Sequence, residues 1–197
     1  MKRKIISLIL ILCICMVCGC TEKKTDVDTT TVFIHKDGSI TDAIVEEFTA
    51  GYYDAAELQT MTNKELTAYN QSTGDTNSAV LSQYQVADGI AKVFVDFKTI
   101  QDYSAFNETN CYFGTIADAY EAGYDLDVTL KNIAGDKTAD KNTLLEMGKN
   151  KILILEEHVD VITYKRILYK SANVDMIDDN HARISDEAEG YAYIVIK

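Results

Sequence analysis

The first twenty residues separate a targeting segment from the part of the chain that can fold into a domain. Three cations, Lys2 to Lys4, precede an apolar run from Ile5 to Val17 that is interrupted only by Ser7. A positive start followed by such a run is typical of a secretory signal peptide. The run is shorter than the ~20 residues that a membrane-spanning helix needs. We therefore interpret residues 1–19 as a removable signal.

The signal ends in Val17-Cys18-Gly19-Cys20. This resembles the lipobox of bacterial lipoproteins, in which a branched apolar residue and two small residues precede the cysteine that becomes acylated; Cys18 is less usual at its place than Ala or Ser. The resemblance implies lipidation of Cys20 and palmitate-type acyl chains in the bilayer. Two acyl chains make a stable anchor, since each buried CH₂ contributes ~0.8 kcal/mol. The alternative is an ordinary signal peptide with an incidental cysteine.

The composition restricts the partners of the mature chain. Without the leader, 16 basic residues face 31 acidic ones, and the formal charge is −15. Because phosphate backbones are bound by clustered Lys and Arg, we expect no nucleic-acid partner. Repulsion from anionic headgroups would leave the tethering to the lipid.

The cysteine count excludes an internal disulfide in the mature body. Of five cysteines, only Cys111 lies beyond Cys20, so no internal disulfide can form. We expect Cys111 to be a small buried hydrophobe. The 178 residues are enough for one well-cored domain, which we expect to be monomeric.

Residues 21–30 are polar and lack periodicity, so residues 20–30 read as the lipidated cysteine and a flexible tether, followed by a single domain over residues 31–197. Asp-Gly pairs between β-rich runs predict two hairpins. Asp54 and Thr99 are suitable N-caps for helices. The expected elements are hairpins over 31–48 and 79–97; helices over 54–70, 99–107 and 115–122; and strands over 111–114, 124–130, 152–155, 159–164, 167–170, 174–177, 181–185 and 191–196.

These elements predict an α+β fold, a mostly antiparallel sheet with two or three helices packed on one face. Residues 131–145 are expected to form a long loop or a hairpin tip. The apolar run 152–155 is expected to be a central strand buried on both faces.

The helix beginning after Asp54 carries the speculative binding residues Glu65 and Tyr69. A helical projection places Glu65 between Met61 and Tyr69, near the middle of the apolar arc. A buried carboxylate needs a partner or a raised pKa. Two interpretations are open. A small rotation of the helix could bring Glu65 to the solvent-exposed edge of the apolar face. Alternatively, this helix lines an apolar groove in which Glu65 and Tyr69 supply the polar groups that contact a ligand.

No motif for nucleophilic, phosphate-binding or zinc-dependent catalysis is present in the sequence. His35, His158 and His181 stand apart, and the Asp26/Asp28, Asp125/Asp127 and Asp178-Asp179-Asn180 groups lack the calcium-loop pattern. We expect no cofactor and no metal. The tyrosines could form a sugar- or peptide-binding surface, although packing at strand edges is the favoured role. They are Tyr52, Tyr53, Tyr103, Tyr112, Tyr120, Tyr191 and Tyr193.

The order of segments resembles small cell-surface lipoproteins of unknown function from Gram-positive, clostridial-type bacteria. The resembling stretches are Thr31–Gly38, Tyr53–Leu58, Ala68–Asn70 and Gly114–Gly123. The resemblance implies a single mature domain at the cell envelope and carries no activity, cofactor or site.

We therefore expect a membrane-anchored extracytoplasmic lipoprotein that is not an enzyme but binds an envelope partner, a protein or a glycan, or has a structural role. One alternative is an extracytoplasmic glycan or cell-wall hydrolase that uses dispersed carboxylates. Another is an accessory subunit of a transport or secretion complex, which would expose an apolar patch.

Overall fold

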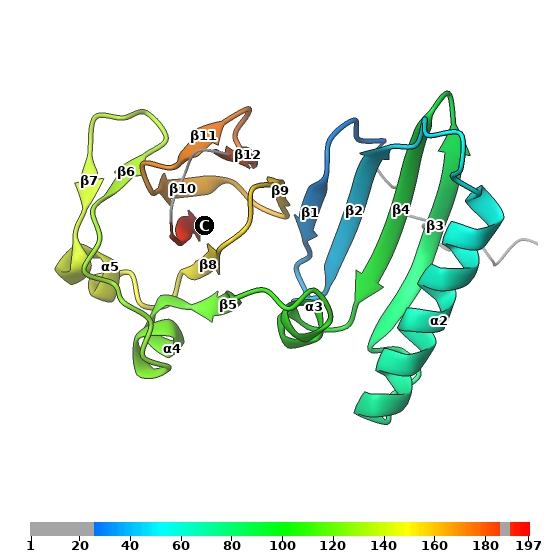
Figure 1. Cartoon of the computed structure of the whole chain (residues 1–197). Helices are drawn as coiled ribbons and strands as arrows, with labels where there is room; N and C mark the ends of the chain where they lie inside the picture. Colours follow the sequence, from blue (N-terminus) through cyan, green and yellow to red (C-terminus); the bar gives the residue numbers. More distant parts are fainter. Residues whose placement is uncertain (1–25, 186–189) are drawn as a thin grey trace, which may run out of the picture.

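The computed structural model describes residues 26–185 and 190–197, which form two β-sheets with four helices (Figure 1). The predicted α+β class with mostly antiparallel strands is confirmed. The helices are α2 (Ala55–Thr73), α3 (Ile100–Phe106), α4 (Ile116–Glu121) and α5 (Lys141–Glu146).

The seven-stranded sheet contains both predicted hairpins. Its order is β11-β12-β9-β1-β2-β4-β3, and all neighbours are antiparallel except β1 and β9. Asp88 and Gly89 have φ values of 53° and 77°, which a two-residue turn between twisted strands requires. The strands are β1 (Thr31–Ile34), β2 (Ile40–Glu47), β3 (Ala79–Ala87), β4 (Ile90–Phe97), β9 (Asp160–Thr163), β11 (Val174–Met176) and β12 (His181–Ile184).

The six-stranded sheet is antiparallel throughout, in the order β5-β8-β13-β10-β6-β7. Strand β8 lies between β5 and β13 and is buried on both faces, as its continuous apolar run predicts. The strands are β5 (Cys111–Thr115), β6 (Leu130–Asn132), β7 (Thr138–Ala139), β8 (Lys151–Leu155), β10 (Ile167–Lys170) and β13 (Ala192–Ile196).

The main core joins one face of each sheet. Alternate residues of β4, among them Val93, Val95 and Phe97, pack in the same cluster as Leu153 and Ile194 from the six-stranded sheet. The other face of the six-stranded sheet is covered by α4, α5 and residues 124–130. The expectation that the helices pack on one face is not confirmed, because the strands divide into two sheets and each has apolar surface to cover. Helix α2 contacts β3, whereas α4 and α5 contact strands of the six-stranded sheet.

The helix starts follow the predicted caps. The Asp54 carboxylate accepts hydrogen bonds from the backbone of Ala56 at 2.8 Å and Glu57 at 3.0 Å. The Thr99 hydroxyl accepts one from the backbone of Asp102 at 3.1 Å. Helix α2 extends past the predicted end at Asn70 and stops at Gly74.

Two predictions between residues 124 and 146 are wrong or incomplete. Residues 124–129 form no strand; Leu126, Val128 and Leu130 alternate because they fill the cluster beneath α4 and α5. The region 131–145 contains the β6–β7 hairpin but also the unpredicted helix α5, which Asp140 caps.

Candidate functional site

Residues 26–30, which the sequence assigns to a flexible tether, lie on the outer face of the seven-stranded sheet. Val27 is buried against Ala43 and Phe94. The Thr30 hydroxyl accepts a hydrogen bond from the backbone N–H of Val45 and donates to its carbonyl. Residues 26–30 are therefore packed on the fold and are not a free tether, and we call them the N-terminal segment.

Lys92 fixes the start of the N-terminal segment. Its ammonium lies 2.7 Å from the Asp26 carboxylate and 3.2 Å from that of Asp28. The hydrogen bond that Lys92 donates to Asp26 is the main cause of the raised pKa of Lys92, so the ammonium stays charged at neutral pH. The aspartates considered as calcium ligands thus neutralise a lysine.

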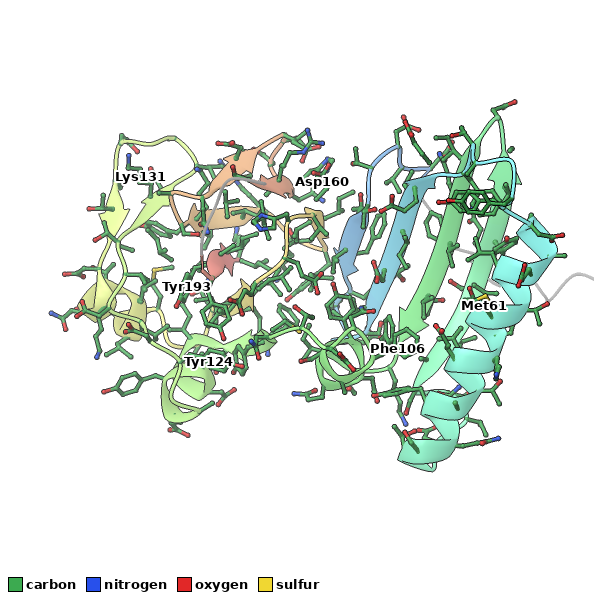
Figure 2. The ribbon with its side chains drawn as sticks, viewed as in Figure 1. Met61, Phe106, Tyr124, Lys131, Asp160 and Tyr193 are labelled. Carbon is green, nitrogen blue, oxygen red and sulfur yellow. The ribbon has the colours of Figure 1, made fainter. Side chains whose placement is uncertain are left out.

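A second charge cluster surrounds Asp160, a carboxylate that is only 4% exposed (Figure 2). Arg183 donates to both oxygens at 2.6 and 2.9 Å, Thr29 donates at 3.0 Å, and the His181 ring lies 3.1 Å away. Burial alone would raise the pKa of Asp160, but the bonds from Arg183 and Thr29 outweigh it and hold the pKa below 3.8. The arrangement is a satisfied ion pair that also holds the N-terminal segment.

The most perturbed acid of the described residues is Asp42, on β2. It points into the core between its strand neighbours Val32 and Val95 and is 6% exposed. Burial, together with the negative charge of Glu157, raises the pKa of Asp42 from 3.8 to about 7, although a hydrogen bond from Asn107 opposes the shift.

Tyr103, on α3, contacts Glu157, the acid whose charge acts on Asp42. Its hydroxyl donates to the Glu157 carboxylate at 2.5 Å. Burial and the charges of Asp42 and Glu157 raise the pKa of Tyr103, which therefore stays a donor. We call Asp42, Glu157, Tyr103 and Asn107 the acid cluster. A carboxyl that titrates near neutrality can exchange a proton, but Asp42 lies inside the core.

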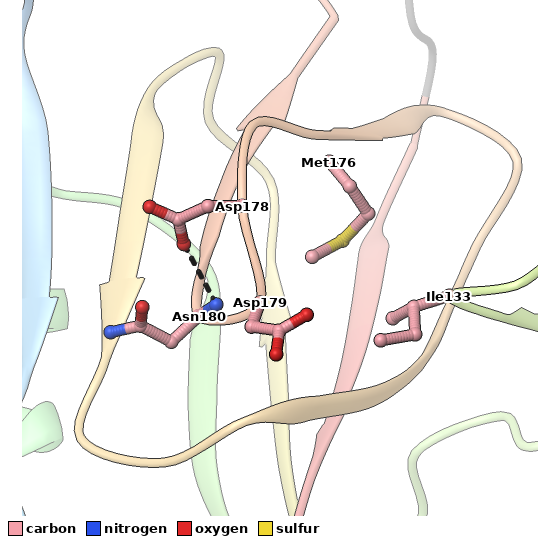
Figure 3. A pocket seen from close by; sticks show the side chains of 5 residues that line it. All are labelled: Ile133, Met176, Asp178, Asp179 and Asn180. Carbon is pink, nitrogen blue, oxygen red and sulfur yellow. Dashed lines mark hydrogen bonds between the residues drawn. The ribbon is translucent and has the colours of Figure 1, made fainter.

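A shallow hollow of about 490 Å³ lies elsewhere, beside the turn after β11 (Figure 3). Its lining combines apolar Ile133 and Met176 with the polar turn 178–180. The Asp178 carboxylate accepts a hydrogen bond from the Asn180 backbone at 2.9 Å, the turn role that the sequence favours. None of the acid cluster lines this hollow.

The structure places Glu65 on the exposed side of α2, so it is not a buried carboxylate. The stripe of α2 that packs on the sheet runs through Ala55, Leu58, Thr62, Leu66 and Tyr69. Compared with the predicted arc it is rotated away from Met61, which is 52% exposed.

Tyr69 is half-buried and donates to the Asp102 carboxylate at 3.1 Å. Its hydroxyl joins α2 to α3, so Tyr69 and Glu65 do not form the polar point of a groove. The proposed lipidation site, Cys20, lies outside the described residues, as do residues 1–19.

The remaining candidates are distributed over the fold. The described residues contain no group of three or more His, Cys, Asp or Glu that could hold a metal. Cys111 is buried, and burial is the main cause that raises its pKa to about 12. The tyrosines form no common surface: Tyr103 and Tyr193 are buried, whereas Tyr52 and Tyr120 are exposed. Tyr193 packs near Tyr191, on the six-stranded sheet (Figure 2).

Sequence reasoning missed Asp42, Glu157 and Asp160. A signal for Asp42 exists, because Ile40, Asp42 and Ile44 are alternate residues of a strand whose other members enter the core. Asp160 and Glu157 offer no comparable signal, since the burial of Asp160 and the contacts of Glu157 depend on packing between distant segments.

No helix within residues 26–185 and 190–197 combines the length and hydropathy that crossing a bilayer requires. Comparison of the chain with protein families, curated proteins and solved structures gives no match.

Proposed function

We propose that this protein is an extracytoplasmic lipoprotein, anchored through acylated Cys20, whose domain serves as a non-enzymatic binding or structural module at the cell envelope. The observation that carries the proposal is the sequence Val17-Cys18-Gly19-Cys20 after a cationic and apolar leader.

A module that works by binding is supported by the state of its charged groups. Asp160 is neutralised by Arg183, and Asp26 and Asp28 share an ion pair with Lys92. These groups stabilise the fold and need no substrate to complete them. The acidic mature surface favours partners other than nucleic acid.

The acylation test compares two cysteines of the same motif. The full chain is expressed in a bacterium that processes lipoproteins and is labelled with an alkyne fatty acid. We expect the Cys20→Ala variant to lose the label and leave the membrane fraction. The Cys18→Ala variant is the matched control and keeps both, because small residues are accepted before the acylated cysteine. A labelled Cys20→Ala variant would refute the proposal.

One observation favours a second candidate, a glycan or cell-wall hydrolase. The charge of Glu157 contributes to the raised pKa of Asp42, and hydrolases of this class use two carboxyl groups, of which the general acid has a raised pKa. The burial of Asp42 argues against it. Release of soluble sugar from wall glycan by the wild-type protein, abolished in the Asp42→Asn variant, would establish the enzyme and displace the binding module.

A further inference from the structure

The N-terminal segment fixes where the lipid anchor leaves the fold. Asp26 is held by Lys92, which pairs in the sheet with Val45 near the end of β2. The six steps from Asp26 back to Cys20 span at most about 22 Å, since each residue adds no more than ~3.6 Å. That end of the seven-stranded sheet consequently cannot move further than this from an acylated Cys20.

Aromatic side chains are exposed at this same end. Phe48 follows β2 and donates its backbone N–H to Gly89 in the β3–β4 turn at 2.7 Å. The Phe48 and Tyr53 rings stack with centroids 4.8 Å apart, and Tyr52 lies edge-on to Tyr53 at 4.9 Å. Tyr52 is 82% exposed and Tyr53 is 47% exposed. We call Phe48, Tyr52 and Tyr53 the aromatic tip.

The aromatic tip lies within reach of the bilayer. Val45, the strand partner of Lys92, and Phe48 are three residues apart, which is roughly 10 Å along a strand. Figure 1 shows the β2–α2 connection and the β3–β4 turn at one end of the sheet, the end at which the chain enters β1. The tether is therefore about twice as long as the distance along the strand, which places the aromatic tip within its reach.

We propose that the aromatic tip rests in the headgroup region of the membrane to which Cys20 is attached, so that the domain has a fixed orientation on the bilayer. This inference relies on the proposed acylation. Tyrosine joins an apolar ring to a hydroxyl and is enriched at membrane–water interfaces for that reason. Contact removes exposed ring surface from water, and the tether holds the tip at a high local concentration.

The charges of this end determine how the contact should respond to salt. Glu46, Glu47, Asp54 and Asp88 are exposed around the tip. They repel anionic headgroups, so the contact with anionic lipid should strengthen as salt screens them. A membrane contact made by a basic patch would weaken instead.

The chain contains no tryptophan, so a single substitution supplies a unique fluorescent probe. Acylated full-length Tyr52→Trp is placed in nanodiscs of phosphatidylcholine whose acyl chains carry bromine near the headgroup. Tyr120→Trp is the matched control, because Tyr120 is 47% exposed but lies on α4, against the six-stranded sheet. We expect bromine to reduce the emission of the Tyr52→Trp variant and to leave that of the Tyr120→Trp variant unchanged.

The result separates the two proposals. Mass spectrometry first determines whether Cys20 is acylated; an unmodified cysteine refutes the lipoprotein proposal. With acylation established, equal emission loss in both variants, or no loss in either, refutes the fixed orientation alone. Added salt in discs that contain anionic lipid should increase the quenching of the Tyr52→Trp variant, and a decrease would contradict the proposed contact.

Discussion

Replacing Asp42 by Asn should increase the free energy of unfolding, and the increase should grow as the pH rises through the range in which Asp42 ionises. Asp42 has a pKa of about 7 in the fold and about 3.8 when exposed, a difference that corresponds to about 4 kcal/mol at ~1.4 kcal/mol per pH unit. Because the folded state binds this proton more tightly than the unfolded state does, the wild type has its full stability below pH 4. It loses up to about 4 kcal/mol of the free energy of unfolding as the pH rises from 4 towards 7. Above that pH the ionised carboxylate opposes folding.

The Asp42→Asn variant removes this ionisation and retains an oxygen that can accept the hydrogen bond from Asn107. Urea unfolding followed by circular dichroism at pH 5 and pH 8 measures the effect. The variant should gain up to about 4 kcal/mol over the wild type at pH 8 and much less at pH 5. Asp175→Asn, an exposed change on β11, is the control and should leave the pH profile unchanged. Equal stability of Asp42→Asn and wild type at pH 8 would refute the assignment of Asp42 as a buried acid.

Two substitutions and one labelling experiment test other parts of the fold. Arg183→Met removes the bidentate partner of buried Asp160 and should cost about 1–3 kcal/mol in the free energy of unfolding, measured in urea. Gly89→Ala should cost about 1–2 kcal/mol in the same assay, because a side chain is strained at φ +77°. Cys111, with a pKa of about 12, should not react with a thiol reagent at pH 8 until urea unfolds the chain.

The two substitutions each have a matched control. Arg166→Met removes an exposed arginine 3.8 Å from Asp179 and should leave the urea midpoint nearly unchanged. Gly51→Ala meets no atom within 4 Å and has no positive φ, so it should be tolerated. A loss of stability as large as that of the tested variants, or rapid labelling of native Cys111, would contradict the reasoning.

Local signals predicted most of the elements. The Asp88-Gly89 pair identified its hairpin because few residue pairs other than Asp-Gly accept two positive φ angles, and Asp54 identified the start of α2. The continuous apolar run of β8 identified a strand buried on both faces. Each of these signals depends on a few neighbouring residues.

The errors occurred where tertiary packing decides the structure. Residues 124–129 alternate like a strand because they cover a core, but no strand of the described residues pairs with them. The division into two sheets depends on pairings such as β1 with β9, between residues about 130 positions apart. Sequence patterns do not encode such partners.

In the candidate sites, too, local sequence patterns predicted some features, and tertiary packing determined the others. The helical projection for α2 was correct in its period, and Leu66 is buried as it predicts, but the buried stripe is rotated so that Glu65 and Met61 are exposed. The acid cluster forms because the β8–β9 connection brings Glu157 over α3 and β2, and no local pattern near either acid indicates the other.

The parallel pair of β1 and β9 determines the order in which this chain can assemble. Strand β1 needs β9 as its second neighbour, and β13 at the carboxyl end lies between β8 and β10. Neither sheet is complete until almost the whole polypeptide is available, and closing such distant contacts is slow. A protein delivered with its amino terminus first would therefore remain unassembled during transfer and would gain its cooperative stability only once its last strand had arrived.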